Sequence, residues 1–156
     1  MISKNGETFL HNLESCSLEA YLDIAGIPTI GWGNTIYLNG ARVKLGDTIT
    51  QRQADALFLI TCQGISKKID VYCNRKLNVN QHDALVSFCY NVGTQAFKNS
   101  TLLRLLNNGV STLSAEIEVQ WMRWDKAHID GKLVRVKGLK NRRRKEYSLF
   151  IIRTGV

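Results

Sequence analysis

Two carboxylic side chains near the start of the chain, Glu14 and Asp23, are of the type that acid/base hydrolysis requires. Glycosidic bonds are cleaved by a pair of carboxyl groups. One donates a proton to the leaving oxygen, and the other, ionised, activates water, acts as a nucleophile or stabilises the developing oxocarbenium charge. Two acids nine residues apart also occur in many chains as solvated surface groups. Spacing alone therefore does not assign a catalytic pair.

The expected local structure gives the two carboxyl groups different surroundings. Ser3 can cap a first helix that ends near Glu14, where the negative pole of the helix dipole disfavours an ionised carboxylate. Residues 18–23 and 29–34 have the composition of two strands joined by a turn, with Asp23 exposed where the first strand ends. Environments that separate the protonation of two carboxyl groups assign the acid and the base. Glu14 therefore fits the acid and Asp23 the base.

Glycines flank Trp32 at positions 31 and 33 and leave both of its neighbours without side chains. Such a pattern allows a ligand or another backbone to approach closely. Trp32 is thus a candidate to stack on a sugar face, and the alternative is that it fills the core.

The remainder of the chain is expected to be helical. Thr50 and Gln53 form a capping-box pair at the start of the longest apolar-periodic segment, which we expect to join two lobes. The fold class is therefore α+β and mainly helical, in a single domain over residues 1–156. Its expected parts are a small β-hairpin lobe (12–50), a connecting helix (51–72), and a helical lobe (73–156 with helix 3–14). Within that lobe we expect helices at 80–92, 100–108, 113–124 and 139–153, and a polar loop at 127–136.

The positive charge of the chain is concentrated at one end. The net charge is +8, and residues 126–156 carry ten basic side chains against two acidic ones, which accounts for the whole excess. Such a segment attracts a polyanion, whether nucleic acid, an acidic membrane surface or an anionic cell-envelope polymer.

Cysteine and histidine spacing indicates no metal site and no cofactor. The four cysteines (Cys16, Cys62, Cys73 and Cys89) form no CxxC pair, and His11, His82 and His128 lie at no zinc-ligand spacing. We expect reduced, buried cysteines that act as small hydrophobes, with a Cys62–Cys73 bridge as the alternative in an oxidising compartment. The sequence contains no membrane-length apolar run and no signal peptide, which favours a protein made in the cytoplasm.

The segment ESCSLEAYLDIAGIPTIGWGNT (residues 14–35) resembles the active-site signature of the phage-type lysozymes, the endolysin muramidases. It holds Glu14, then Asp23 after eight residues and Thr29 after five more. Three later blocks are similar to later blocks of that family, in the same order, and extend the resemblance over nearly the whole chain: QHDALVSFCYNVG (81–93), STLLRLLNNG (100–109) and GLKNRRRKEYSLF (138–150).

The resemblance implies a two-lobed, lysozyme-like fold and hydrolysis of the β-1,4 bond between N-acetylmuramic acid and N-acetylglucosamine in peptidoglycan. Glu14 would be the general acid, Asp23 the base that activates water, and Thr29 a hydroxyl that holds that water. The family usually inverts configuration, for which carboxyl groups about 6.5–9.5 Å apart leave room for the water.

The resemblance also implies substrate-binding residues and an arginine partner for the acid. Tyr90 and Asn91 would line the far wall of the cleft, and Arg142 or Arg143 would approach Glu14, which favours its ionised form. The chain departs from the family pattern at Ser15, where glycine is common, and at Asn34, where many members have histidine.

Two alternatives belong to other classes. The first is a nucleic-acid-binding module that uses the cluster Arg142–Lys145, which lacks a helix-turn-helix reader and leaves Glu14 to Thr29 unexplained. The second is an inactive glycan-binding homologue, which the presence of all three signature residues disfavours. We therefore expect a monomeric muramidase that binds peptidoglycan and anionic envelope polymers. Such an enzyme would reach the wall through a membrane lesion or another export route.

Overall fold

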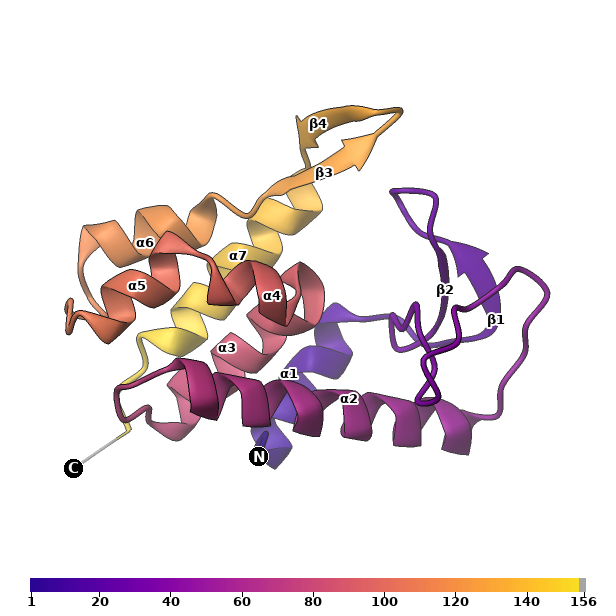
Figure 1. The fold of residues 1–156 in the computed structure, drawn as a ribbon, viewed down its shortest axis with the longest axis horizontal. Coiled ribbons are helices and arrows are strands. Elements are labelled where there is room, and N and C mark those ends of the chain that lie inside the picture. The colour runs from indigo at the N-terminus through magenta and orange to yellow at the C-terminus, as the bar shows by residue number, and fades with distance from the viewer. Residues whose placement is uncertain (155–156) are drawn as a thin grey trace.

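The structure, a computed structural model, describes residues 1–154 and places two lobes at opposite ends of one long helix (Figure 1). The N-terminal lobe holds a small antiparallel hairpin with loops, and the other lobe is helical apart from a second hairpin. The expected α+β, mainly helical fold is confirmed. Within these residues the elements are α1 (Lys4–Leu13), β1 (Ser17–Leu22), β2 (Pro28–Gly31), α2 (Gln51–Tyr72), α3 (Val79–Val92), α4 (Thr94–Lys98), α5 (Thr101–Asn107), α6 (Ala115–Met122), β3 (Lys126–Ile129), β4 (Lys132–Arg135) and α7 (Lys137–Phe150).

The first hairpin pairs β1 with β2 in antiparallel register and sets Tyr21 opposite Thr29. β2 is shorter than the strand expected over residues 29–34. It ends at Gly31 because this glycine has a φ of +63°, outside the β region, and turns the chain away. The segment from residue 32 to residue 50 continues as turns with isolated β-bridges, such as that between Ile30 and Asn34.

α2 connects the two lobes, as expected (Figure 1). The Thr50 hydroxyl accepts from the backbone N–H of Gln53, and the Gln53 side chain accepts from the backbone N–H of Thr50 at 2.8 Å, so the capping box is confirmed. The buried residues of α2 recur every three or four positions, which gives the helix one apolar face. They are Ala54, Leu57, Phe58, Cys62, Ile65, Ser66 and Ile69.

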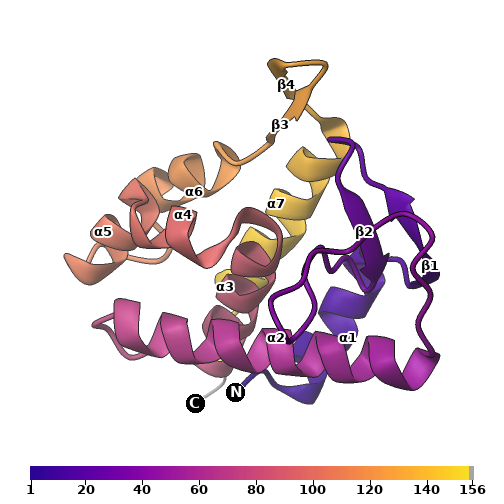
Figure 2. The ribbon, with the colours of Figure 1, turned by 45° about the vertical axis from the view of Figure 1, so that its right-hand side comes forward.

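The core of the helical lobe is built around α3, against which α7 packs (Figure 2). All residues of α3 from Asp83 to Cys89 are buried, so neighbouring elements enclose this helix. Trp121 of α6 is fully buried between Phe88 and Phe150, at ring-centroid distances of 5.1 and 4.8 Å. Trp121 is therefore part of the core.

Several helix boundaries differ from those expected. α3 begins at Val79 rather than at residue 80, because Asn78 is the N-cap and forms a reciprocal capping box with Gln81. The short helix α4, which was not expected, follows Gly93 directly. α7 runs over residues 137–150 rather than 139–153.

The prediction of a loop at residues 127–136 is wrong, because the chain forms the β3–β4 hairpin there. Four cross-strand pairs run from Lys126 opposite Arg135 to Ile129 opposite Lys132. Asp130 and Gly131 connect the strands with φ angles of +49° and +74°, the two positive values that a tight type I′ turn requires. The hairpin projects beyond the start of α7 (Figure 1).

All four cysteines are free thiols. Cys62, Cys73 and Cys89 are buried, and Cys16 is partly exposed. Burial raises the pKa of the Cys62 thiol to about 12, which keeps it protonated and unreactive. Cys62 lies within α2 and Cys73 caps its end, so at 1.5 Å per residue they are about 16 Å apart, too far for a disulfide.

Helix α1 is fixed to α3 through a close contact between Gly6 and Asp83. The Asp83 carboxylate, only 2 % exposed, accepts from the backbone N–H of Ser3 at 2.9 Å and from the Ser3 hydroxyl. The Ser3 hydroxyl in turn accepts from the N–H of Gly6 and caps α1. A Cβ at position 6 would lie 2.5 Å from Asp83 Cγ, so glycine is required for this docking.

We predict opposite effects of alanine at two helical glycines. Gly64→Ala, on an open face of α2, should raise the free energy of unfolding by up to about 1 kcal/mol, since alanine favours the helix. Gly6→Ala should instead lower it by about 1–3 kcal/mol, because the new methyl group collides with Asp83. Urea unfolding of the two variants measures both, and stabilisation by Gly6→Ala would contradict the described docking.

Candidate active site between the lobes

Glu14 stands at the end of α1, where the helix gives way to the hairpin lobe. Its backbone N–H donates to the carbonyl of Leu10 at 2.9 Å and closes the last turn, and Leu10 is fully buried. The Glu14 side chain is 17 % exposed, and its Oε1 accepts a hydrogen bond from Nη1 of Arg142 in α7. One carboxyl oxygen is therefore held by the helical lobe.

The second oxygen of Glu14 faces the backbone of Gly33. A Cβ built on Gly33 would lie 2.9 Å from Glu14 Oε2, and Gly33 has a φ of +93°. Both facts require glycine at this position. The glycines on either side of Trp32 predicted that another group would approach the backbone closely. At Gly33 that group is the carboxylate of Glu14. At Gly31 it is α2, because Ala54 Cα lies 3.7 Å from the place that a Cβ there would occupy.

Asp23 lies at the start of the turn between β1 and β2, as expected. Its Oδ1 accepts from the backbone N–H groups of Ala25 and Ile27, both at 2.8 Å. The N–H of Asp23 also donates to the carbonyl of Ile27 at 3.0 Å, so the turn holds the residue at both ends. Within residues 1–154, no side chain or backbone group donates to Oδ2, which remains able to accept a hydrogen bond.

Thr29 and Tyr21 are paired across the β1–β2 hairpin. Thr29 is only 3 % exposed, and its hydroxyl donates to the carbonyl of Ile27 at 2.9 Å. Partial burial raises the pKa of the Tyr21 hydroxyl, and the negative charges of Glu14 and Asp23 raise it further. The charges of both carboxylates therefore disfavour ionisation of the same hydroxyl.

Arg142 links Glu14 to a second, fully buried carboxylate, Glu146. The Nε of Arg142 donates to Glu146 Oε1 at 3.0 Å, and its Nη2 donates to the carbonyl of Ser87 at 3.2 Å. Arg143 pairs with the same carboxylate through Nε at 2.9 Å and Nη2 at 3.1 Å. Of the two arginines expected near Glu14, Arg142 is the one that bonds it.

Arg143 is fully buried and points away from solvent. Its Nη2 donates to Asn91 at 2.8 Å, and its guanidinium lies 5.0 Å from the centre of the Phe88 ring. Two of the four cationic side chains of the cluster Arg142–Lys145 are thus interior, and the exposed pair is Arg144 and Lys145. The nucleic-acid alternative requires a continuous phosphate-contacting face on this cluster, and residues 142–145 as described form none.

The other candidate residues for substrate binding join the lobes together. Trp32 stacks on His11 at a centroid distance of 4.0 Å and donates its Nε1–H to Asp55 at 2.8 Å, so one ring face is covered. The Tyr90 hydroxyl donates to the carbonyl of Trp32 at 2.8 Å, and Asn34 Nδ2 donates to Thr61 of α2 at 3.1 Å. These bonds hold the turn that carries Gly33.

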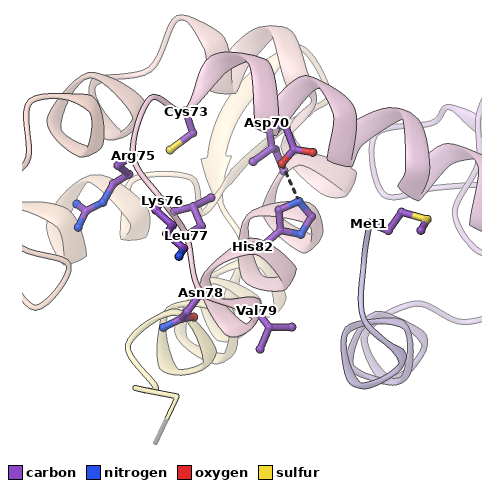
Figure 3. Close-up of a pocket in the computed structure, with 10 residues that line it drawn as sticks. Met1, Asp70, Cys73, Arg75, Lys76, Leu77, Asn78, Val79 and His82 are labelled. Carbon is purple, nitrogen blue, oxygen red and sulfur yellow. Dashed lines mark ion pairs between the residues drawn. The ribbon is translucent and has the colours of Figure 1, made fainter. Parts of the chain in front are cut away.

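A groove of about 400 Å³ runs between the lobes next to Arg142. Its lining residues include Ile24 of the β1–β2 turn, Leu13 of α1, and Val136 and Leu139 at the start of α7. Glu14 follows Leu13 and bonds Arg142, and Asp23 precedes Ile24, but neither these two acids nor Thr29 are among the lining residues. A hollow of about 420 Å³ lies elsewhere, at the junction of α2 and α3, where His82 pairs with Asp70 at 3.4 Å (Figure 3).

Sequence reasoning did not single out Glu146, Tyr21 or the role of Gly33 toward Glu14. A signal for Glu146 was present, since it follows Arg142 and Arg143 by four and three residues and so shares their helix face. In the described part of the chain, no three acidic, histidine or cysteine side chains gather as a metal site. No helix among residues 1–154 is long and apolar enough to span a membrane.

Comparisons with known proteins identify the family of the chain. The phage lysozyme family model matches residues 11–146. The endolysin of Acyrthosiphon pisum secondary endosymbiont phage 1 is 38% identical over 150 residues, covering 96% of this chain and 97% of that protein. For the endolysin of Salmonella phage P22 the identity is 39% over 150 residues, with the same two coverages. The solved endolysin from Escherichia coli O157:H7 phage FAHEc1 superimposes with a TM-score of 0.83 at 35% identity, covering 97% of this chain and 93% of that one. By sequence and fold, the chain belongs to the phage lysozyme family and is a glycoside hydrolase of peptidoglycan.

Proposed function

We propose that the chain is an N-acetylmuramidase that cleaves the β-1,4 bond between N-acetylmuramic acid and N-acetylglucosamine. The observation that carries the proposal is the difference in surroundings between two carboxyl groups, Glu14 at the end of α1 and Asp23 in the β1–β2 turn. Glu14 has one oxygen fixed by Arg142 and the other turned to Gly33. Asp23 has one oxygen fixed by its turn and the other free.

Glu14 is the general acid in this proposal. Its Oε1 accepts from Arg142 Nη1, so a proton on the carboxyl group resides on Oε2. Oε2 donates this proton to the glycosidic oxygen as the bond from that oxygen to the anomeric carbon breaks. The leaving sugar departs as an alcohol, and Glu14 is left ionised beside the arginine.

Asp23 is the base, and Thr29 helps to hold the water. Oδ2 of Asp23 accepts a proton from water while the water oxygen bonds to the anomeric carbon from the face opposite the leaving group. Because the Thr29 hydroxyl donates its hydrogen to the carbonyl of Ile27, its oxygen is free to accept a hydrogen bond from that water. The reaction inverts configuration, and proton exchange with solvent restores both carboxyl groups.

The basic segment serves the same activity by attracting the polymer. The exposed Lys140, Arg144 and Lys145 lie on the helix that carries Arg142, so their field acts close to the site. We propose that the enzyme acts as a monomer on the cell wall after release through a membrane lesion or another export route.

The first prediction concerns the two acids. Glu14→Gln and Asp23→Asn should each lower the rate at which peptidoglycan suspensions clear by at least about 10²-fold, since each removes one proton-transfer step. Asparagine keeps the Oδ1 acceptor for Ala25 and Ile27, so the turn is preserved. Thermal unfolding verifies the fold, and ordinary activity of a folded Glu14→Gln variant would refute the acid assignment.

Product stereochemistry follows from the role of Asp23. A water that attacks opposite the leaving group turns a β-glycoside into an α product. Proton NMR in the first minutes of digestion should therefore show new muramic acid reducing ends as the α anomer, before mutarotation mixes the forms. Initial appearance of the β anomer would mean that Asp23 acts as a nucleophile instead.

Wall binding should depend on charge at the start of α7. The double variant K140Q/R144Q should bind peptidoglycan more weakly than the wild type and show a flatter salt dependence. The control K67Q/K68Q removes two exposed charges from α2 instead. A sedimentation assay measures peptidoglycan binding by both variants from low to high salt. An equal loss of binding in the two variants would show that only the net charge of the protein matters, and not its position on α7.

A further inference from the structure

The end of α1 and the interior of the helical lobe share a cluster of four charges, Glu14, Arg142, Arg143 and Glu146. Arg142 contacts both carboxylates, and Arg143 contacts Glu146. The side chains of Arg142, Arg143 and Glu146 are 9 %, 0 % and 0 % exposed, so water screens these charges little. With both carboxylates ionised, the cluster is neutral.

Protonation of Glu14 changes this balance. A protonated Glu14 leaves two guanidinium groups facing one carboxylate, so the cluster carries one positive charge in a poorly solvated place. Burial lowers the pKa of Arg143 to about 10, so this arginine stays charged where the enzyme works. Without Glu146, two unbalanced guanidinium groups would drive the proton from Glu14.

We propose that Glu146 is a positioning residue for catalysis: it holds Arg142 toward Glu14 and supplies the negative charge that lets Glu14 keep its proton. The inference rests on the proposed role of Glu14 as general acid. Glu146 does not touch the substrate, because it is fully buried. It acts through Arg142, and its two oxygens are fixed further by Ser87 at 2.8 Å and Trp121 at 3.3 Å.

Other groups near the two carboxylates do not replace this charge. Tyr90 and Tyr21 lie within the field of Glu14, and burial raises the pKa of both, so both are neutral when the acid works. Burial likewise raises the pKa of Cys89, which lies within the field of Glu146, and of Cys62, which lies within that of Glu14. The charged or titratable groups around the cluster are Arg142, Arg143, Tyr21, Cys62, Cys89 and Tyr90. Asp23 and Cys16 also act on Tyr21, and Glu7 acts on Cys62.

The test is a set of variants with opposite expected shifts. Glu146→Gln adds one net positive charge to the cluster, so Glu14 should lose its proton at a lower pH than in the wild type. Arg143→Gln removes one positive charge, so Glu14 should titrate higher. The charge-balanced double variant E146Q/R143Q should return toward the wild-type value. Lys67→Gln, at an exposed position of α2, should leave it unchanged.

Two measurements report these shifts independently. NMR of protein with ¹³C-labelled glutamate carboxyl groups gives the titration of Glu14 directly, assigned from the signal missing in Glu14→Gln. The alkaline limb of the pH profile of kcat/KM should move in the same direction, because it follows loss of the proton from the acid. A purely structural role would lower stability in both single variants without moving Glu14 in opposite directions.

Shifts of opposite sign for Glu146→Gln and Arg143→Gln support the proposal. Unmoved titration, or shifts of the same sign, overturn it. If Glu146→Gln does not fold, the comparison of E146Q/R143Q with Arg143→Gln decides, because these two variants differ only at position 146: Glu14 should lose its proton at a lower pH in the double variant. The NMR titration of Glu14 can be measured even if the wild-type protein shows no muramidase activity. Failure of the proposed function is therefore distinguishable from failure of this inference.

Discussion

The ion pair between Arg142 and Glu14 is the interaction on which the site depends. It connects the residue that caps the end of the first helix to the last helix, across 128 positions of the chain. Arg142 in turn is held by Glu146 and by the carbonyl of Ser87 in α3. Because these partners are buried, the guanidinium has a defined position, and so does the carboxylate that it bonds.

The second constraint is the close approach of the hairpin lobe to this carboxylate. The backbone of Gly33 lies close to the Glu14 carboxylate. The turn that contains Gly33 is bonded to α3 and to α2. Tyr90 in α3 bonds the carbonyl of Trp32, and Thr61 in α2 accepts from Asn34. The acid therefore belongs to the helical lobe and the base to the hairpin lobe, with these contacts setting their relative position. A glycosidase needs such control, because the room left for water determines the stereochemical outcome.

Local sequence signals were sufficient for much of the fold. The capping box at Thr50 and Gln53 predicted the start of α2, and the three- and four-residue spacing predicted its buried face. The α3 start was wrong by one residue because Asn78 and Asn80 are both suitable caps. The Asp130–Gly131 turn is a hairpin signal that the polar composition of the segment obscured.

The candidate site was only partly accessible from sequence. The assignment of Glu14 as the acid and Asp23 as the base rested on two local features. Glu14 lies near a helix end, and Asp23 lies in a turn. The partners of Glu14 come from residues 33 and 142, and such long-range contacts leave no trace in local spacing. The same holds for Trp32, whose covered ring face depends on His11 and Phe58.

The most direct measurement is a crystal structure of the Glu14→Gln protein with a bound peptidoglycan fragment that spans the scissile bond. We expect the glycosidic oxygen within about 3.2 Å of the glutamine amide that replaces the carboxyl group. We also expect a water on the opposite face of the sugar, between Asp23 Oδ2 and Thr29 Oγ1. A fragment bound with both carboxyl positions on the same face of the ring, or away from them, would contradict this mechanism.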